Sequence, residues 1–164
     1  MKHPDNRQSG FSIIDMIMGL GILAIAIVGI QIAQNNYINM SNRVEIGLRG
    51  VSLGNSVMNQ IRMHRYDENA TFPWGDTLGT DVGESTLSDY DDIDDYAGAT
   101  WDFSGEGFPG YTVTSRVFNI NVPTNWLDSV GVGPNFKRII VRVNHPELES
   151  PLLFSSIMAG ILNE

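Results

Sequence analysis

The 164 residues of this chain leave room for one compact domain beside a long apolar segment, and not for two domains. Its 19 acidic residues outnumber its 10 lysines and arginines, and most of them fall in one region, which argues against nucleic acid as a partner. The chain contains no cysteine, so no disulfide can stabilise it.

The apolar segment lies near the N-terminus. Between Phe11 and Ile30 the only polar side chains are Ser12 and Asp15. Twenty helical residues span about 30 Å, which is the thickness of the hydrocarbon core of a bilayer. The residues before it, 1–10, form a polar leader with basic residues, so the positive-inside rule predicts a cytoplasmic N-terminus and a single membrane pass.

The junction between leader and apolar segment has an unusual order. A secretory signal carries its cleavage site after the apolar region, whereas here Gly10 precedes it. The run Gly10–Asp15 (GFSIID) resembles the class III signal of type IV pilins and type II secretion pseudopilins, with Asp15 in place of the usual Glu. The resemblance implies cleavage between Gly10 and Phe11 by a prepilin peptidase and N-methylation of Phe11. A simple membrane anchor with a chance Gly-Phe pair is the alternative.

The acid inside the apolar segment needs a partner. A carboxylate in hydrocarbon costs about 2.5–3.5 kcal/mol on insertion scales. In the pilin family this acid is thought to meet the N-terminal amine of a neighbouring subunit, so the resemblance implies an ion pair between Asp15 and a neighbour's Phe11. The alternative is that Asp15 only reaches the membrane interface.

After the apolar segment, the pattern predicts that the helix continues to residue 66 and becomes amphipathic, with one face on a sheet. The glycines along this half cost about 1 kcal/mol each relative to alanine, so packing has to support the helix. The predicted apolar stripe consists of Tyr37, Met40, Val44, Val51, Met58 and Ile61, with Gly47 and Gly54 between them.

Three stretches near the C-terminus favour strands. Residues 111–120 and 138–144 are rich in β-branched and aromatic side chains, and residues 152–158 follow a proline-bounded turn. Trp101 and Phe103 are candidates for a further short strand or a core anchor. The predicted fold is therefore α+β and pilin-like: a long N-terminal helix, membrane-spanning in its first half, packed on a small antiparallel sheet.

Between helix and strands lies an acidic segment with a loop-like composition. Between Tyr66 and Ser115 there are twelve acids and no lysine or arginine. The spacing of the densest run does not match an EF-hand loop, because Ile93 stands where a ligand is needed. We expect a solvated turn whose carboxylates bind backbone N–H groups and no cofactor, with calcium as the alternative. The candidate residues are Asp89, Asp91, Asp92, Asp94 and Asp95.

Three short segments narrow the family resemblance. Residues 65–69, 91–98 and 110–114 are similar to the MshD family, minor pilins of the mannose-sensitive haemagglutinin pilus, although Ala97 replaces a histidine common there. The resemblance implies a subunit that initiates or decorates the pilus or forms part of its tip. The implied partners are other major and minor pilins, the prepilin peptidase, the inner membrane and the pilus assembly machinery. A type II secretion pseudopilin is the nearest alternative.

The resemblance also implies a location and a division of the chain. The protein is expected first in the bacterial inner membrane, with its globular domain in the periplasm, and then in the cell-surface pilus. The predicted parts are the cleaved leader 1–10, the membrane and filament-core half of the helix 11–35, its amphipathic half 36–66, and the exported domain 67–164.

An enzyme is not expected. His64 and His145 are predicted to be solvated, and no nucleophile, metal-ligand or phosphate-binding pattern accompanies them. The remaining alternative is a membrane-anchored binding protein, either adhesive or calcium-dependent. For the adhesive form, Trp74, Trp101 and Trp126 are candidate sugar-contacting residues if they are exposed.

Overall fold

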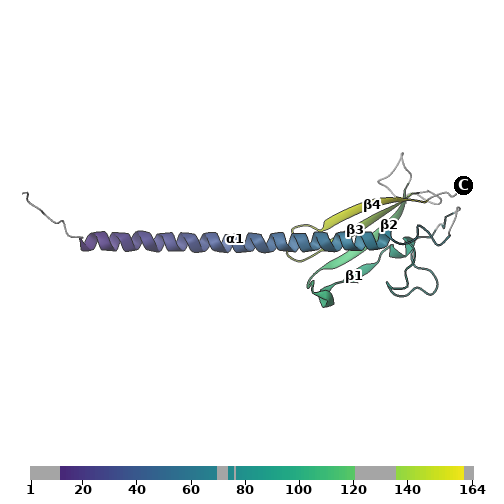
Figure 1. Cartoon of the computed structure of the whole chain (residues 1–164), viewed down its shortest axis with the longest axis horizontal. Coiled ribbons are helices and arrows are strands. Elements are labelled where there is room, and N and C mark those ends of the chain that lie inside the picture. The colour runs from purple at the N-terminus through teal and green to yellow at the C-terminus, as the bar shows by residue number, and fades with distance from the viewer. Residues whose placement is uncertain (1–11, 70–73, 76, 121–135, 161–164) are drawn as a thin grey trace, which may run out of the picture. The chain divides into compact units, whose positions relative to one another are not determined.

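The computed structural model describes residues 12–69, 74–75, 77–120 and 136–160. It contains one long helix followed by a four-stranded antiparallel sheet with strand order β1-β2-β3-β4 (Figure 1). The α+β prediction of a long N-terminal helix and an antiparallel sheet is confirmed. The elements in chain order are α1 (Ile13–Arg62), η1 (Asp94–Tyr96), β1 (Thr100–Asp102), η2 (Ser104–Glu106), β2 (Thr112–Ile120), β3 (Phe136–Asn144) and β4 (Leu152–Ala159).

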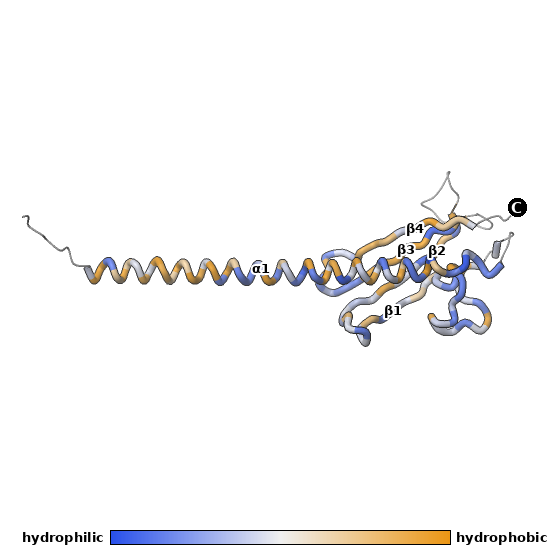
Figure 2. Tube along the Cα trace, in the orientation of Figure 1, coloured by the Kyte–Doolittle hydropathy of each residue, from blue (hydrophilic) through white to orange (hydrophobic). Residues whose placement is uncertain are grey.

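The chain divides into two units, residues 1–42 and 43–164. In the first unit the described residues belong almost entirely to α1, and all of their side chains are exposed. Apolar residues dominate this part of the helix (Figure 2). Of the described residues, only α1 forms a helix long and apolar enough to cross a membrane, judged by length and composition.

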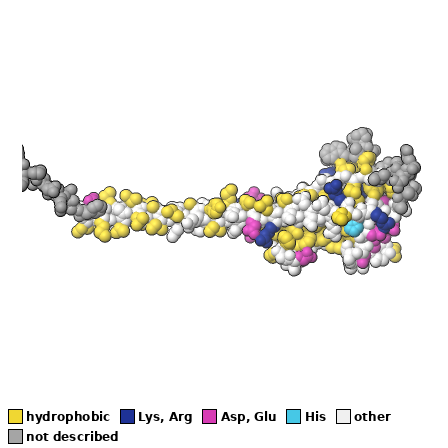
Figure 3. Space-filling model, viewed as in Figure 1, with side chains coloured by type: hydrophobic (Ala, Val, Ile, Leu, Met, Phe, Trp, Pro, Cys, Tyr) yellow, Lys and Arg dark blue, Asp and Glu magenta, His cyan; other side chains and the backbone are white. Residues whose placement is uncertain are grey.

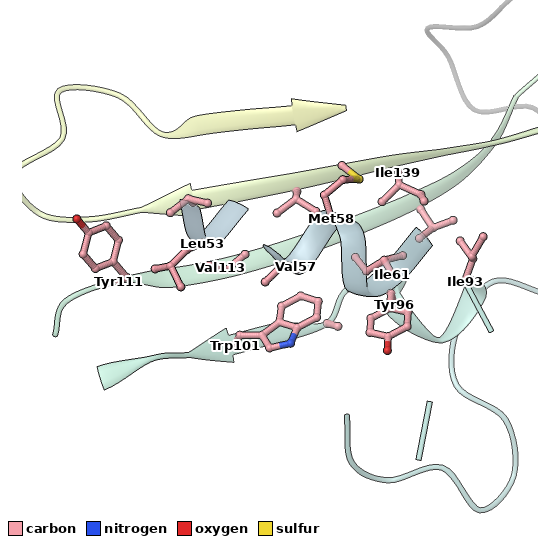
Figure 4. Close-up of a cluster of buried hydrophobic side chains, with 14 residues drawn as sticks. Leu53, Val57, Met58, Ile61, Ile93, Tyr96, Trp101, Tyr111, Val113 and Ile139 are labelled. Atoms are coloured by element: carbon pink, nitrogen blue, oxygen red, sulfur yellow. The ribbon is translucent and has the colours of Figure 1, made fainter. Parts of the chain in front are cut away.

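In the second unit, the last turns of α1 lie on one face of the sheet. Leu53, Val57, Met58 and Ile61 point from the helix toward side chains of β2 and β3, and Trp101 of β1 closes the same core (Figure 4). Burying such side chains contributes about 1.5–3 kcal/mol each, which supports a helix segment rich in glycine. This burial supplies the packing that the sequence analysis expected to support the glycine-rich half of the helix.

The apolar stripe predicted for the helix is partly wrong. Met58 and Ile61 are buried, but Tyr37, Met40 and Val44 are exposed, and Val51 is 40% exposed. The buried positions of α1 are instead Gly50, Leu53, Gly54, Val57, Met58 and Ile61. The glycines explain the difference between the predicted and the observed buried positions. The helix face nearest the sheet contains Gly50 and Gly54, which have no apolar side chain for a hydrophobic pattern to detect.

Two of these glycines permit close approach to β4. A Cβ built on Gly50 would lie 2.9 Å from Leu152 Cδ1, and one on Gly54 would lie 2.1 Å from the ring of Phe154. Gly47 has nothing within 4 Å of its Cβ position. Glycine is therefore required at Gly54 by packing, whereas at Gly47 it only lowers helix propensity.

The strands occupy the predicted positions within two residues. β3 begins at Phe136, two residues before the predicted start, and the short strand around Trp101 is present as β1. Residues on β2 and β3 alternate between the buried and the outer face. Lys137 is an exception to the rule that residues on the buried face are apolar, since it lies on that face and is only 1% exposed.

The chain turns sharply after the helix. α1 ends at Arg62 rather than continuing to residue 66, and Arg65 then pairs with Asp92 in a parallel bridge. The N–H of Ile93 donates to the carbonyl of Arg65 at 3.0 Å, and the N–H of Arg65 donates to the carbonyl of Asp91 at 3.3 Å. This bridge places the acidic segment against the end of the helix.

Candidate functional site

The N-terminal motif lies partly outside the described residues. Gly10 and Phe11 are not among them, whereas Asp15 occupies the first turn of α1. Its Oδ2 accepts a hydrogen bond from the N–H of Ser12 at 3.3 Å, and Ser12 Oγ accepts one from the N–H of Ile14 at 3.3 Å. The two side chains thus cap the first turn in the manner of a capping box, with Ser12 Oγ bound to the second helical N–H rather than the third. The Ser-x-x-Asp pattern could have indicated this role for Asp15. Among the described residues, no lysine or arginine pairs with Asp15.

Three aspartates of the acidic segment organise its backbone. Asp95 Oδ2 accepts N–H groups from Asp91 and Asp92 at 3.0 and 3.1 Å. Asp92 Oδ1 accepts those of Asp94 and Asp95 at 2.7 and 3.3 Å. Asp89 Oδ2 accepts those of residues 85 and 86 at 3.2 and 2.9 Å. The expectation that these carboxylates bind backbone N–H groups is confirmed.

The expectation that the whole segment is solvated is wrong. Asp92, Asp94 and Asp95 are each at most 5% exposed, although Asp89 and Asp91 are exposed. Carboxylates are rarely buried without partners, because their desolvation is costly. Asp92 and Asp95 have backbone N–H groups as partners, whereas the partner of Asp94 comes from a distant part of the chain.

That partner is Lys137 of β3. Its ammonium donates to Asp94 Oδ2 at 2.6 Å, to Asp67 Oδ2 at 2.9 Å and to the carbonyl of Tyr66 at 2.8 Å. The same Nζ lies 4.3 Å from the centre of the Tyr66 ring. All donors of the ammonium therefore have acceptors, which is the condition for burying a charge at tolerable cost.

The pKa values of the two carboxylates bound by Lys137 are shifted in opposite directions. Burial raises the pKa of Asp94 to about 7, and Lys137 opposes that shift without cancelling it. Burial also acts to raise the pKa of Asp67, but the N–H of Gly75 and the ammonium of Lys137 outweigh it, and this pKa is lowered. Gly75 donates to both oxygens of Asp67 at 3.0 Å.

Other carboxylates meet near the same place. Single oxygens of Glu68, Asp91 and Asp92 lie within 4.8 Å of one another, as do those of Glu84, Asp91 and Asp95. These are the described residues whose mutual spacing suits a metal ion. The predicted aspartates are therefore brought together, but with Glu68 and Glu84, which the sequence had not singled out.

Arg65 already neutralises part of the first group. Its guanidinium donates to Asp91 Oδ2 and, at 3.2 Å, to Glu68 Oε2. The pairing with Asp91 raises the pKa of Arg65. Being on the surface, this ion pair adds little to stability, because solvent screens the two charges. The guanidinium also holds Glu68 and Asp91 close together just after the end of α1.

Sequence reasoning missed Lys137, Asp67 and Arg65. The available signal for Lys137 was its place at the start of an alternating strand, in phase with the buried positions Ile139, Val141 and Val143. Nothing in the local sequence indicates which acids it contacts, because these lie 43 and 70 residues away.

The aromatic and histidine candidates take structural positions. Trp74 and Trp101 are each 7% exposed, which removes them from a sugar-contacting surface, and Trp126 lies outside the described residues. His64 is half-buried rather than solvated, with its Nε2 3.0 Å from the hydroxyl of Tyr96. His145 is also half-buried, with its ring centre 4.5 Å from that of Tyr111. Neither histidine belongs to the carboxylate groups described above.

Comparison of the chain with protein-family models, curated proteins and solved structures finds no match.

Proposed function

We propose that this protein is a minor type IV pilin, a structural subunit that is processed at Gly10, anchored in the inner membrane by α1 and incorporated into a pilus. The single observation that carries the proposal is the composition of α1. One helix, Ile13–Arg62, begins with an exposed apolar segment containing a single acid in its first turn, and its last turns pack on an antiparallel sheet.

The exposed apolar side chains of α1 support this function. The residues between 16 and 40 carry no charge, and their apolar side chains are roughly half to three-quarters exposed. Figure 3 shows hydrophobic side chains over this part of the helix, whereas charged side chains gather on the globular domain. Such a surface needs either lipid or other apolar helices around it. A pilin would meet both in turn, first in the membrane and then in the filament.

Asp15 is proposed as the assembly residue. Its carboxylate has no described cationic partner, and cleavage after Gly10 would place a new amine on Phe11 of every subunit. An ion pair between Asp15 and the Phe11 amine of a neighbour would neutralise both groups in the filament core. The capping box with Ser12 is compatible with this role, because it uses only Oδ2.

The processing test is mass spectrometry of the N-terminal peptide from sheared pili and from the inner-membrane fraction. We expect a peptide that begins at N-methylated Phe11 in the sheared material. A chain found only in the membrane with residues 1–10 attached would contradict the proposal. Recovery of the processed chain with a secretion complex, and not with pili, would favour the pseudopilin alternative.

The assembly test separates pairing from capping. We expect Asp15→Asn to abolish incorporation into pili and Asp15→Glu to retain it, since only the second keeps the charge. Ser12→Ala is the matched control, because it removes one half of the capping box and leaves the acid. Equal loss of incorporation in Ser12→Ala and Asp15→Asn would contradict the ion pair and indicate that Asp15 acts only as a helix cap.

A further inference from the structure

The outer face of the sheet combines basic and apolar side chains. α1 packs on the inner face, whereas Leu153 and Ile157 on the outer face are 69% and 44% exposed. The same face carries Arg116 of β2 and Arg138 and Arg142 of β3, and the strands β2, β3 and β4 contain no acid. This face is therefore positively charged, in a chain whose formal net charge is −9.

The register of the strands brings these side chains together. Ile140 lies opposite Arg116, and Arg138 and Arg142 flank it two residues away on the same strand. Residues two apart on one strand lie about 7 Å apart, and directly paired residues about 5 Å apart. Leu153 of β4 is paired with Arg142. We call this surface the basic face, and it consists of Arg116, Arg138, Ile140, Arg142, Leu153 and Ile157.

Two arginines of the basic face have unused charge. Arg116 and Arg142 are exposed, and neither forms an ion pair with a described residue. Among the four described strands β1 alone contributes an acid, Asp102, whose Oδ1 accepts the N–H of Ser104 at 2.9 Å. A guanidinium with no carboxylate beside it is suited to bind one from another molecule.

A tight turn in the acidic segment has the complementary surface. The N–H of Glu84 donates to the carbonyl of Asp81 at 3.2 Å, and Glu84 Oε2 accepts the N–H of Asp81 at 3.1 Å. Gly83 has a φ of 113°, which glycine adopts readily and which closes the turn. The side chain of Val82 is fully exposed at the tip. Neither Asp81 nor Glu84 forms an ion pair with a described lysine or arginine.

Charge and shape together decide which occupant suits the basic face. A nucleic acid or an anionic membrane also attracts arginine, but either would meet the acidic segment as well, because the chain has 19 acids against 10 lysines and arginines. A tight turn contacts a smaller area and can reach the basic face alone. The turn 81–84 also offers an apolar tip between two acids, which matches an apolar surface between arginines.

We propose that the basic face binds the turn 81–84 of a second copy of this chain. In this contact Val82 packs against Leu153, and the two carboxylates of the turn meet Arg116 and Arg142. The two surfaces are different, so the contact is heterologous: each pair leaves one basic face and one turn free, and further copies can add in series. The contact is additional to the proposed pilus role, and its test requires neither processing nor pili.

Disulfide cross-linking tests the contact specifically, because the chain contains no cysteine. Ser85→Cys places a thiol beside the turn, and Ser155→Cys places one on β4 next to the basic face; both positions are exposed. Full-length chains with one substitution each and with different tags are purified in detergent micelles, mixed and oxidised. We expect a heterodimer in the mixture and little symmetric dimer in either variant alone, since a heterologous contact brings unlike surfaces together.

A charge reversal on one partner at a time locates the contact. Arg142→Glu in the Ser155→Cys chain should lower the heterodimer yield about tenfold or more, because like charges then face each other. In the Ser85→Cys chain, whose basic face takes no part in that cross-link, the same substitution should leave the yield unchanged, which also shows that the variant folds. Asp81→Arg in the Ser85→Cys chain should restore the yield with the reversed partner.

Three outcomes overturn the proposal. Absence of a heterodimer leaves the basic face to another acidic partner or to lipid. A yield that Arg142→Glu lowers in neither chain assigns the association to α1. A yield that it lowers equally in both chains shows that the contact is not between the basic face of one copy and the turn of the other.

Discussion

Replacing Lys137 with methionine is the most direct perturbation of the folded domain. The change keeps an unbranched side chain and removes the ammonium that donates to Asp94, Asp67 and the carbonyl of Tyr66. Asp67 and Asp94 are 3% and 5% exposed, so loss of the ammonium leaves both carboxylates largely desolvated and without their cation. Breaking a buried ion pair by removing one member costs about 3–5 kcal/mol, and we expect a loss of this size at pH 7.5.

Urea unfolding of the full chain in detergent micelles, followed by tryptophan fluorescence, measures this loss. Arg142→Met on the same strand is the matched control, because Arg142 is exposed and forms no ion pair with a described residue. Its effect should stay within about 0.5 kcal/mol. Adding Asp94→Asn to Lys137→Met should recover part of the loss, because it removes one stranded carboxylate. A cost below about 1 kcal/mol for Lys137→Met, or one equal to that of the control, would refute the role given to the ammonium.

Three further outcomes follow from the contacts described. Gly54→Ala should destabilise the domain by about 1–3 kcal/mol through its clash with Phe154, whereas Gly47→Ala should stabilise it by about 0.4–1 kcal/mol; equal shifts in thermal melts would contradict the packing argument. In EDTA, the free energy of unfolding should fall as the pH rises from 5 to 8. Burial raises the pKa of Asp94 to about 7, so the folded state holds a proton that the unfolded state has released, and this contribution is lost as the pH rises through that pKa. Asp94→Asn should flatten this dependence, and an unchanged slope in urea titrations would exclude Asp94 as its source. Pili sheared from cells should contain the Asp15→Glu chain and lack Asp15→Asn, as judged by mass spectrometry, and normal incorporation of both would contradict the ion pair.

The helix and strands follow from patterns that a sequence displays directly. The segment that opens α1 is continuously apolar, and the runs around Val117 and Val141 are rich in β-branched residues. Both kinds of element occur where these patterns predict them. The helix face was harder to predict. Gly50 and Gly54 are buried by close approach to β4, and a missing side chain carries no hydrophobic signal.

The acidic segment shows the limit of local reasoning. The capping by Asp92 and Asp95 is a short-range property and was expected. The burial of Asp94 between them was not expected, because it depends on a cation that the fold brings from β3. Composition alone therefore suggested a solvated surface, because the hydrogen bond between Lys137 and Asp94 joins residues 43 positions apart in the sequence.

Lys137 also fixes the alignment of the sheet. If β3 slipped by one residue against β2, every side chain would change face, and the ammonium would leave Asp67 and Asp94 for the outer surface. A slip by two residues would keep the face but move the ammonium about 7 Å along the strand, beyond reach of either carboxylate. Alternating apolar residues distinguish only the first error from the native pairing. The buried ammonium of Lys137 distinguishes both errors, because either shift would leave Asp67 and Asp94 buried without their cation.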